Sequence, residues 1–143
     1  MEITASSLQE TENLTKQLVG NLKPGDTLAL YGELGSGKTT FVSFLVKALG
    51  FEDRVQSPTF ILVRHYKKSS GEIKHIFHVD LYRIIDTKEI DNLGLQELFE
   101  EKDALVIIEW PELLKNYLPE NTIKVNFTYI DENSRKINVQ NLS

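Results

Sequence analysis

The residues whose types and spacing suggest chemistry begin with the run Gly32–Thr39, GELGSGKT, which matches the phosphate-binding pattern G-x-x-x-x-G-K-[ST]. Phosphate carries several negative charges, and backbone N–H groups can surround it only where no Cβ intervenes. Lys38 would add positive charge at the β and γ phosphates, and the Thr39 hydroxyl is suited to Mg²⁺. The dipole of the helix that follows favours the same anion. The run therefore predicts nucleotide binding rather than a glycine turn that only joins a strand to a helix.

A phosphate-binding loop of this kind works with an acidic residue across the sheet, usually at the end of an apolar strand, which holds Mg²⁺ or orients a water. Two acids fit this description. Glu109 follows the apolar run 104–108, and Asp80 follows the segment 76–79. For either one alone, an exposed acid at a strand end is the alternative, but the pair predicts that at least one is functional. The residues themselves leave open which of the two binds the metal.

Three further residues are candidates on weaker grounds. Thr59, in Ser57–Phe60, lies in the connection after the loop's helix, where a threonine could reach the γ-phosphate and Mg²⁺. A proline turn before a strand explains this segment equally well. Arg83 could meet a phosphate or a partner, although a lone arginine is more often a surface residue. Trp110, beside Glu109, is more typical of core packing than of a nucleotide contact.

Composition narrows the possible functions. A chain of 143 residues suits one domain with its own core, and 41% hydrophobic residues are typical of a globular protein. The formal charge of −5 argues against a protein that grips nucleic acid alone, and we expect no DNA partner. We expect a cytoplasmic protein without a membrane partner, because no targeting signal and no apolar run of about 20 residues is present. There is no cysteine, and His65, His75 and His78 lack zinc-like spacing, which favours roles on strand surfaces.

Hydrophobic periodicity predicts the helices. The first begins at the capping pattern Ser7–Glu10 and has an apolar stripe of Leu14, Leu18 and Leu22. The second spans 37–49 and is followed by Gly50 in a left-handed conformation. Its buried face is expected to consist of Phe41, Phe44, Leu45, Ala48 and Leu49. Asp86 with Glu89 is expected to open a third helix, with Ile90, Leu93 and Leu98 facing inward, and Pro111 a short fourth.

Strands are predicted at 27–31, 59–66, 73–79, 104–108, 123–129 and 136–139. The polar link 67–71 indicates an antiparallel hairpin, and the continuous apolar run 104–108 is typical of a central strand covered on both faces. Within 123–129, Ile123, Val125, Phe127 and Tyr129 are expected to face the core. The mixture predicts an α/β, P-loop NTPase-like three-layer fold with a mixed parallel/antiparallel central sheet. We expect residues 1–143 to form a single P-loop ATPase domain.

Three kinds of phosphate-loop protein are alternatives to an ATPase for this sequence pattern. A small-molecule kinase normally needs a lid with several arginines, whereas the arginines here are widely spread at 54, 64, 83 and 135. A GTPase would need an Asn-Lys-x-Asp segment to read guanine, and its absence favours adenine. The sequence does not decide between an ATPase and a binding module, in which the nucleotide only fixes the shape that a partner recognises.

Five segments together carry a resemblance to a known family. They are Gly32–Thr40, Ser57–Phe60, His78–Arg83, Leu93–Leu95 and Ile108–Trp110. In this order and spacing they resemble the bacterial TsaE (YjeE) family over nearly the whole chain. The resemblance implies a small ATPase required for N6-threonylcarbamoyladenosine (t6A) in tRNAs that read codons beginning with A. It also implies ATP and Mg²⁺ as cofactors, TsaD and TsaB as partners, and tRNA reached only through that complex.

The resemblance also assigns residues. It implies that Lys38, Asp80, Glu109 and Thr59 are catalytic, with Asp80 acting on the attacking water and Thr59 as a switch-like residue. It implies Thr39 and Glu109 as Mg²⁺ ligands. The implied nucleotide contacts are Ser7, Thr11, Leu34, Gly35, Ser36, Gly37, Lys38, Thr39, Thr40, Trp110 and Arg135. The resemblance places the adenine at the N-terminal segment, for which Ser7–Thr11 is the candidate. Glu33 and Ser36 stand where the family often has Asp and Ala, which are mild changes.

Overall fold

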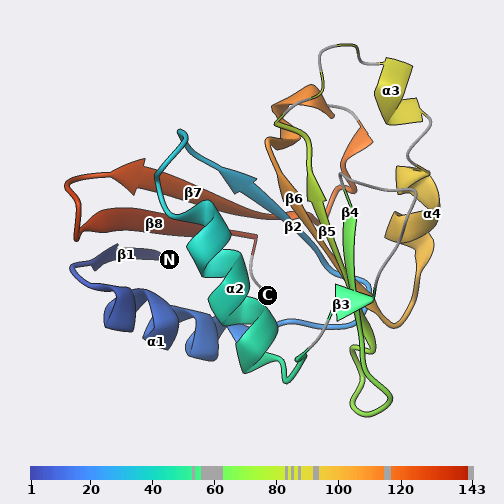
Figure 1. Ribbon diagram of the computed structural model, residues 1–143, viewed down its shortest axis with the longest axis horizontal. Coiled ribbons are helices and arrows are strands. Elements are labelled where there is room, and N and C mark those ends of the chain that lie inside the picture. Colours follow the sequence, from blue (N-terminus) through green and yellow to red (C-terminus); the bar gives the residue numbers. More distant parts are fainter. Residues whose placement is uncertain are drawn as a thin grey trace.

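The strands define the architecture of the computed structural model, which describes residues 1–52, 54–55, 63–82, 84, 86, 88–91, 94–114 and 117–141. The strands of this described part are β1 (Glu2–Ala5), β2 (Thr27–Tyr31), β3 (Arg54–Val55), β4 (Val63–Lys67), β5 (His75–Asp80), β6 (Ala104–Glu109), β7 (Ile123–Tyr129) and β8 (Arg135–Gln140). They form one sheet in the order β1-β8-β7-β2-β6-β5-β4-β3 (Figure 1). The central neighbours β7, β2, β6 and β5 are parallel, and the pairs outside them are antiparallel. The predicted mixed sheet is therefore confirmed.

Helices cover both faces of this sheet. They are α1 (Leu8–Val19), α2 (Lys38–Ala48), α3 (Lys88–Asp91), α4 (Leu95–Glu100) and the 3₁₀ turn η1 (Pro111–Leu113). Alternate residues of β6 show the layering, because Leu105 and Ile107 pack in the core beneath α1 and α2. Val106 and Ile108 belong to a second core, formed with residues of α3 and α4. All of β6 is buried, as expected of a strand covered on both faces, and the fold has three layers.

The start of α1 follows the predicted capping chemistry. The Ser7 hydroxyl accepts a hydrogen bond from the Glu10 N–H at 3.2 Å, and the Glu10 carboxylate accepts one from the Ser6 N–H at 2.5 Å. Leu14 and Leu18 are buried on one face of the helix. Leu22 is also buried, but it lies beyond the end of the helix at Val19.

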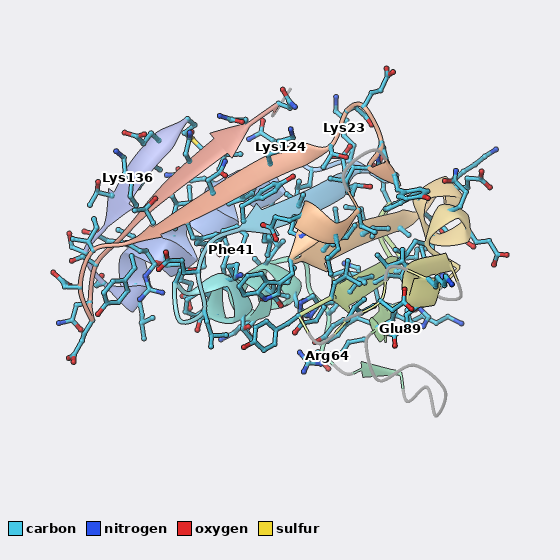
Figure 2. The ribbon with its side chains drawn as sticks, turned by 90° about the horizontal axis from the view of Figure 1, so that it is seen from above. Lys23, Phe41, Arg64, Glu89, Lys124 and Lys136 are labelled. Atoms are coloured by element: carbon cyan, nitrogen blue, oxygen red, sulfur yellow. The ribbon has the colours of Figure 1, made fainter. Side chains whose placement is uncertain are left out.

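The α2 helix forms where it was predicted, with Gly50 at φ 86°, but its buried face differs from the predicted one. The buried apolar residues are Phe41, Val42, Leu45 and Val46, whereas Phe44, Ala48 and Leu49 are half-buried. The reason is that α2 packs against α1 as well as the sheet, which widens and turns the apolar arc. Figure 2 shows Phe41 between α2 and the sheet, with Lys124 and Lys136 projecting on the opposite side.

Other differences concern short elements. Strands β1 and β3 were not predicted, and the single helix expected after Asp86 is two short helices separated by Gly94 at φ 68°. Tyr129, expected to face the core, is 54% exposed because β7 runs past the edge of the core there. Ser57–Phe60, Arg83 and Leu93 lie outside the described residues. None of the described helices has the length and apolar character needed to cross a membrane.

Candidate nucleotide-binding site

The predicted functional residues meet at the carboxyl edge of the parallel strands. The glycine-rich loop joins β2 to α2, and Glu109 and Asp80 are the last residues of β6 and β5. These two acids are direct partners in the β5–β6 register, and Glu109 also pairs with Leu30 of β2. A cleft of about 330 Å³ opens here. Its walls are Leu8, Leu34, Gly35, Gly37, Lys38, Thr39, Thr40, Asp80, Tyr82, Glu109, Trp110 and Arg135.

Two glycines of the loop occupy positions that a side chain would disturb. Gly37 caps the N-terminus of α2 at φ 100°, and a Cβ there would lie 1.9 Å from the Arg135 Nη1 atom. Gly32 has φ 148°, and a Cβ there would lie 2.8 Å from the Phe127 carbonyl oxygen of β7. The glycines thus let the loop pack closely against β7 and Arg135.

We expect Gly32→Ala to destabilise the protein more than Gly35→Ala. Gly35 has φ 80°, but apart from its chain neighbours no atom of the described residues lies within 4 Å of the place its Cβ would take. Its variant should therefore lose only about 1–2 kcal/mol of unfolding free energy from backbone strain. Gly32→Ala must also displace the β7 backbone, which adds about 1–3 kcal/mol. Urea unfolding of both variants measures the difference. Equal losses would show that the loop does not press on β7.

Lys38 places a largely dehydrated positive charge in the cleft. Its side chain is only 5% exposed, its Nζ donates to the Gly32 carbonyl at 2.6 Å, and the same atom lies 3.6 Å from the centre of the Trp110 ring. Burial lowers the pKa of Lys38, while the nearby carboxylates of Glu109, Glu112 and Asp80 act in the opposite direction. A charge with so little water around it interacts strongly with an arriving anion.

Glu109 is the most enclosed acid of the site, with 3% of its surface exposed. The Thr39 hydroxyl donates to its Oε1 at 3.3 Å, and the His78 Nε2 lies 2.5 Å from its Oε2. Burial alone would raise the pKa of Glu109. The hydrogen bond and charge of His78, the bond from Thr39 and the charge of Lys38 outweigh burial, and the pKa is lowered. The favoured form is therefore the carboxylate.

Aromatic side chains form the rim beside Asp80. One Asp80 oxygen accepts a hydrogen bond from the Tyr82 N–H at 3.0 Å. The Tyr82 ring lies 5.1 Å from the Trp110 ring, tilted by 42°. Trp110 has φ 61°, a left-handed conformation that is uncommon for a bulky residue and is typical of functional sites. The pair forms a wall of the cleft next to both acids.

The structure brings together most of the sequence-predicted residues. Leu34, Gly35, Gly37, Lys38, Thr39, Thr40, Asp80, Glu109, Trp110 and Arg135 line the cleft. Ser36 is buried in the loop, and its hydroxyl has no hydrogen-bond partner in the described part of the chain. Ser7 and Thr11 are not among the lining residues. Ser7 caps α1, and the buried Thr11 hydroxyl donates to the Ser7 carbonyl at 3.4 Å. Thr59 lies outside the described residues.

Tyr82 and His78 were not predicted to be part of this region, and Leu8 was covered only by the segment Ser7–Thr11 that the resemblance implied for adenine. Leu8, at the start of α1, and Tyr82 both line the cleft although more than half of each is exposed. An exposed apolar residue at a helix start was the available signal for Leu8, and the position two residues after Asp80 was the signal for Tyr82. His78, expected on a strand surface, is instead buried against Glu109. That expectation was wrong because β5 is covered by neighbouring elements on the face that His78 occupies.

The donor set at Thr39 and Glu109 fits Mg²⁺. Both side chains offer hard oxygen atoms, and Mg²⁺ usually takes one or two protein ligands and completes its octahedron with water and phosphate oxygens. Across the described residues, no group of three or more His, Cys, Asp or Glu side chains could hold a metal ion by itself. A site of one hydroxyl and one carboxylate beside a phosphate loop is therefore one that needs the nucleotide to be complete.

The three layers, the parallel β2–β6 pair and the loop at the start of α2 define a protein of the P-loop NTPase-like fold class. Comparison with known proteins narrows the class. The profile of the family described as threonylcarbamoyl adenosine biosynthesis protein TsaE matches residues 5–137, and the chain belongs to this family. The resemblance seen in the sequence motifs is thereby confirmed.

Individual relatives agree with the family profile. The tRNA threonylcarbamoyladenosine biosynthesis protein TsaE of Rickettsia typhi is 38% identical over 138 residues, covering 96% of this chain and 92% of the relative. The protein of the same name from Bacillus subtilis is 33% identical over 129 residues, with 90% and 78% covered. The crystal structure of Bacillus subtilis YdiB superposes with a TM-score of 0.73 at 28% identity, covering 96% of this chain and 82% of that one.

Proposed function

We propose that this protein binds ATP with Mg²⁺ and hydrolyses it in the service of t6A formation in tRNAs that read codons beginning with A. The relatives named above are tRNA threonylcarbamoyladenosine biosynthesis proteins, which supports the biological process. The observation that carries the chemical part is the convergence of Lys38, Thr39, Glu109 and Asp80 on one cleft. We place this work in the cytoplasm, on a complex of TsaB and TsaD.

Each residue has a distinct task in this proposal. The loop N–H groups and Lys38 bind the phosphates, and Thr39 with Glu109 would hold the Mg²⁺, which neutralises phosphate charge when bound. Glu109 suits the metal better than Asp80, because Glu109 contacts Thr39 and Asp80 bonds instead to the Tyr82 N–H. A carboxylate has further lone pairs beyond the one Tyr82 uses, so Asp80 can accept a proton or a hydrogen bond from an attacking water.

The apolar rim of the cleft suits the remainder of the nucleotide. Leu8, Leu34 and Tyr82 are exposed side chains that also line the cleft, and an adenine ring can pack on such groups. Leu8 lies within the segment Ser7–Thr11 that the family resemblance implied for adenine. Arg135 reaches the loop from β8 and adds positive charge near Gly37.

The surface charge is consistent with an indirect relation to tRNA. The chain carries a formal charge of −5, whereas direct nucleic-acid binding requires a clustered basic face. In the proposed arrangement the partners hold the tRNA, and this protein supplies ATP hydrolysis that supports their turnover.

Steady-state ATP hydrolysis, measured for the protein alone and with TsaB plus TsaD, tests the proposal. We expect slow hydrolysis alone, because the four arginines of the sequence are too widely spread to suggest a lid over the nucleotide. We expect the partners to stimulate hydrolysis at least about tenfold by completing the phosphate site. Asp80→Asn should keep ATP binding but remove the stimulated hydrolysis. Asp26→Asn is the matched control, since Asp26 precedes β2 at the opposite edge of the sheet.

Other outcomes would point to the alternatives. Transfer of phosphate to an added small molecule, without stimulation by the partners, would favour a kinase. Full t6A formation by the Asp80→Asn variant would favour a binding module whose nucleotide only sets its shape.

A further inference from the structure

The feature that the proposed chemistry does not use is the buried imidazole of His78. The side chain is 2% exposed and lies on β5 two residues before Asp80. Its Nε2 is 2.5 Å from the Glu109 Oε2, across the parallel β5–β6 pair. Its other nitrogen, Nδ1, is buried without a hydrogen-bond partner among the described residues. The polar interaction of this imidazole is therefore directed at one atom of the metal-binding candidate.

We propose that His78 is a positioning residue, which holds the Glu109 carboxylate so that its second oxygen stays beside Thr39 for Mg²⁺. This inference rests on the proposed function and names a residue to which neither the sequence motifs nor the comparisons assign a task. His78 itself touches neither the metal nor the nucleotide.

The two carboxylate oxygens of Glu109 have different hydrogen-bond partners. Oε2 bonds to His78, which is held in place by the buried strand around it, while Oε1 accepts from the Thr39 hydroxyl at 3.3 Å. A glutamate has three rotatable side-chain bonds, and a single contact at 3.3 Å is a weak restraint on them. The short bond to His78 is the stronger restraint, and it fixes the direction in which Oε1 points.

Chemistry favours this arrangement for a metal ligand. Carboxylates that bind metals are usually hydrogen-bonded by an outer partner, and loss of that partner typically lowers metal affinity about 10–100-fold. A histidine with a purely structural role could donate its hydrogen bond to any buried acceptor. Here the acceptor is the strand-end acid whose other oxygen faces the first residues of α2, and this placement relates His78 to the site.

The test separates metal affinity from folding and from nucleotide affinity. The chain has one tryptophan, Trp110, which lies in the cleft with the Lys38 ammonium over its ring, so its fluorescence should report nucleotide binding. A non-hydrolysable ATP analogue is titrated in EDTA, and Mg²⁺ is then titrated at a fixed analogue concentration. The variants are His78→Ala, His78→Gln, whose amide N–H can reach a similar point, and His78→Asn, which is shorter. His75→Ala on the same strand is the control, because His75 contacts His65 and Asp103 and not Glu109.

We expect His78→Ala to bind the analogue in EDTA within about twofold of the unsubstituted protein, but to need about 10–100-fold more Mg²⁺ for half-maximal effect. His78→Gln should recover most of the difference, and His75→Ala should show none. An unchanged Mg²⁺ requirement in His78→Ala would overturn the inference, and so would an equal loss of binding with and without Mg²⁺. If His78→Ala does not fold, the comparison of His78→Gln with His78→Asn decides in the same way.

The failure of the proposed function would look different. The unsubstituted protein would then bind the analogue without any effect of Mg²⁺, or would not bind it at all. That result would remove both proposals, whereas a normal Mg²⁺ response in every His78 variant would remove only this one.

Discussion

Lys38→Ala should lower ATP hydrolysis in the presence of TsaB and TsaD by at least about 100-fold and weaken ATP binding to a similar degree. Lys38 is the buried cation of the cleft, held by the Gly32 carbonyl and the Trp110 ring. A phosphate of ATP would form a strong ion pair with the poorly hydrated Lys38 ammonium, and alanine cannot form this pair. Isothermal titration with ATP and a phosphate-release assay measure the two effects.

The variant should nevertheless fold. Burial lowers the pKa of Lys38, so truncation removes a desolvation cost together with the contacts to the Gly32 carbonyl and the Trp110 ring. We expect its thermal midpoint to stay within about 3 °C of the parent value. Lys47→Ala, in the last turn of the same helix, is the matched control and should keep full activity. Hydrolysis by Lys38→Ala at more than a tenth of the parent rate would contradict the assignment of the cleft.

Phe41→Ala should remove about 3–5 kcal/mol of the free energy of unfolding. Phe41 is fully buried on α2, and its ring packs edge-to-face on Phe127 of β7 with centroids 5.1 Å apart. Truncation leaves a cavity between α2 and the sheet, directly behind the phosphate loop. A fall of the thermal midpoint on the order of 10–20 °C follows from this loss.

Phe44→Ala provides the comparison for that prediction. Phe44 is on the same helix but only half-buried, so its truncation should cost clearly less, about 1–2 kcal/mol. Denaturant unfolding of the two variants, side by side, gives both numbers. Equal costs would mean that α2 is rotated about its axis relative to the structure, with Phe44 in the core as the sequence pattern alone suggested.

The phosphate loop could be predicted from the sequence because its chemistry is local. Its glycines, lysine and threonine lie within eight residues, and the strand before and helix after it are strongly patterned. Asp80 and Glu109 could be recognised as strand-end acids for the same reason. Their meeting with Thr39 in one cleft, however, depends on β5, β6 and β2 being parallel neighbours, and no local pattern shows which strands pair.

What could not be predicted was decided by contacts between distant segments. Strand β1 is four residues long and exists through its pairing with β8, more than a hundred residues away. The burial of His78 depends on which neighbours cover that face of β5. The predicted buried face of α2 was wrong because periodicity shows an apolar arc but does not show that both α1 and the sheet pack against the helix.

Strand β6 contributes side chains to both cores described above, and this has a consequence for local stability. Every residue of β6 is buried, with alternate side chains in each core, so its amide hydrogens should exchange with deuterium only when the whole domain opens. The α3 and α4 helices have four and six residues, well below the roughly 12–15 at which a helix holds on its own, and depend on one core alone. They should take up deuterium early while the amides of α2 stay protected. The fold would thus combine a rigid phosphate-binding half with a second half, containing α3 and α4, that unfolds locally at a low free energy.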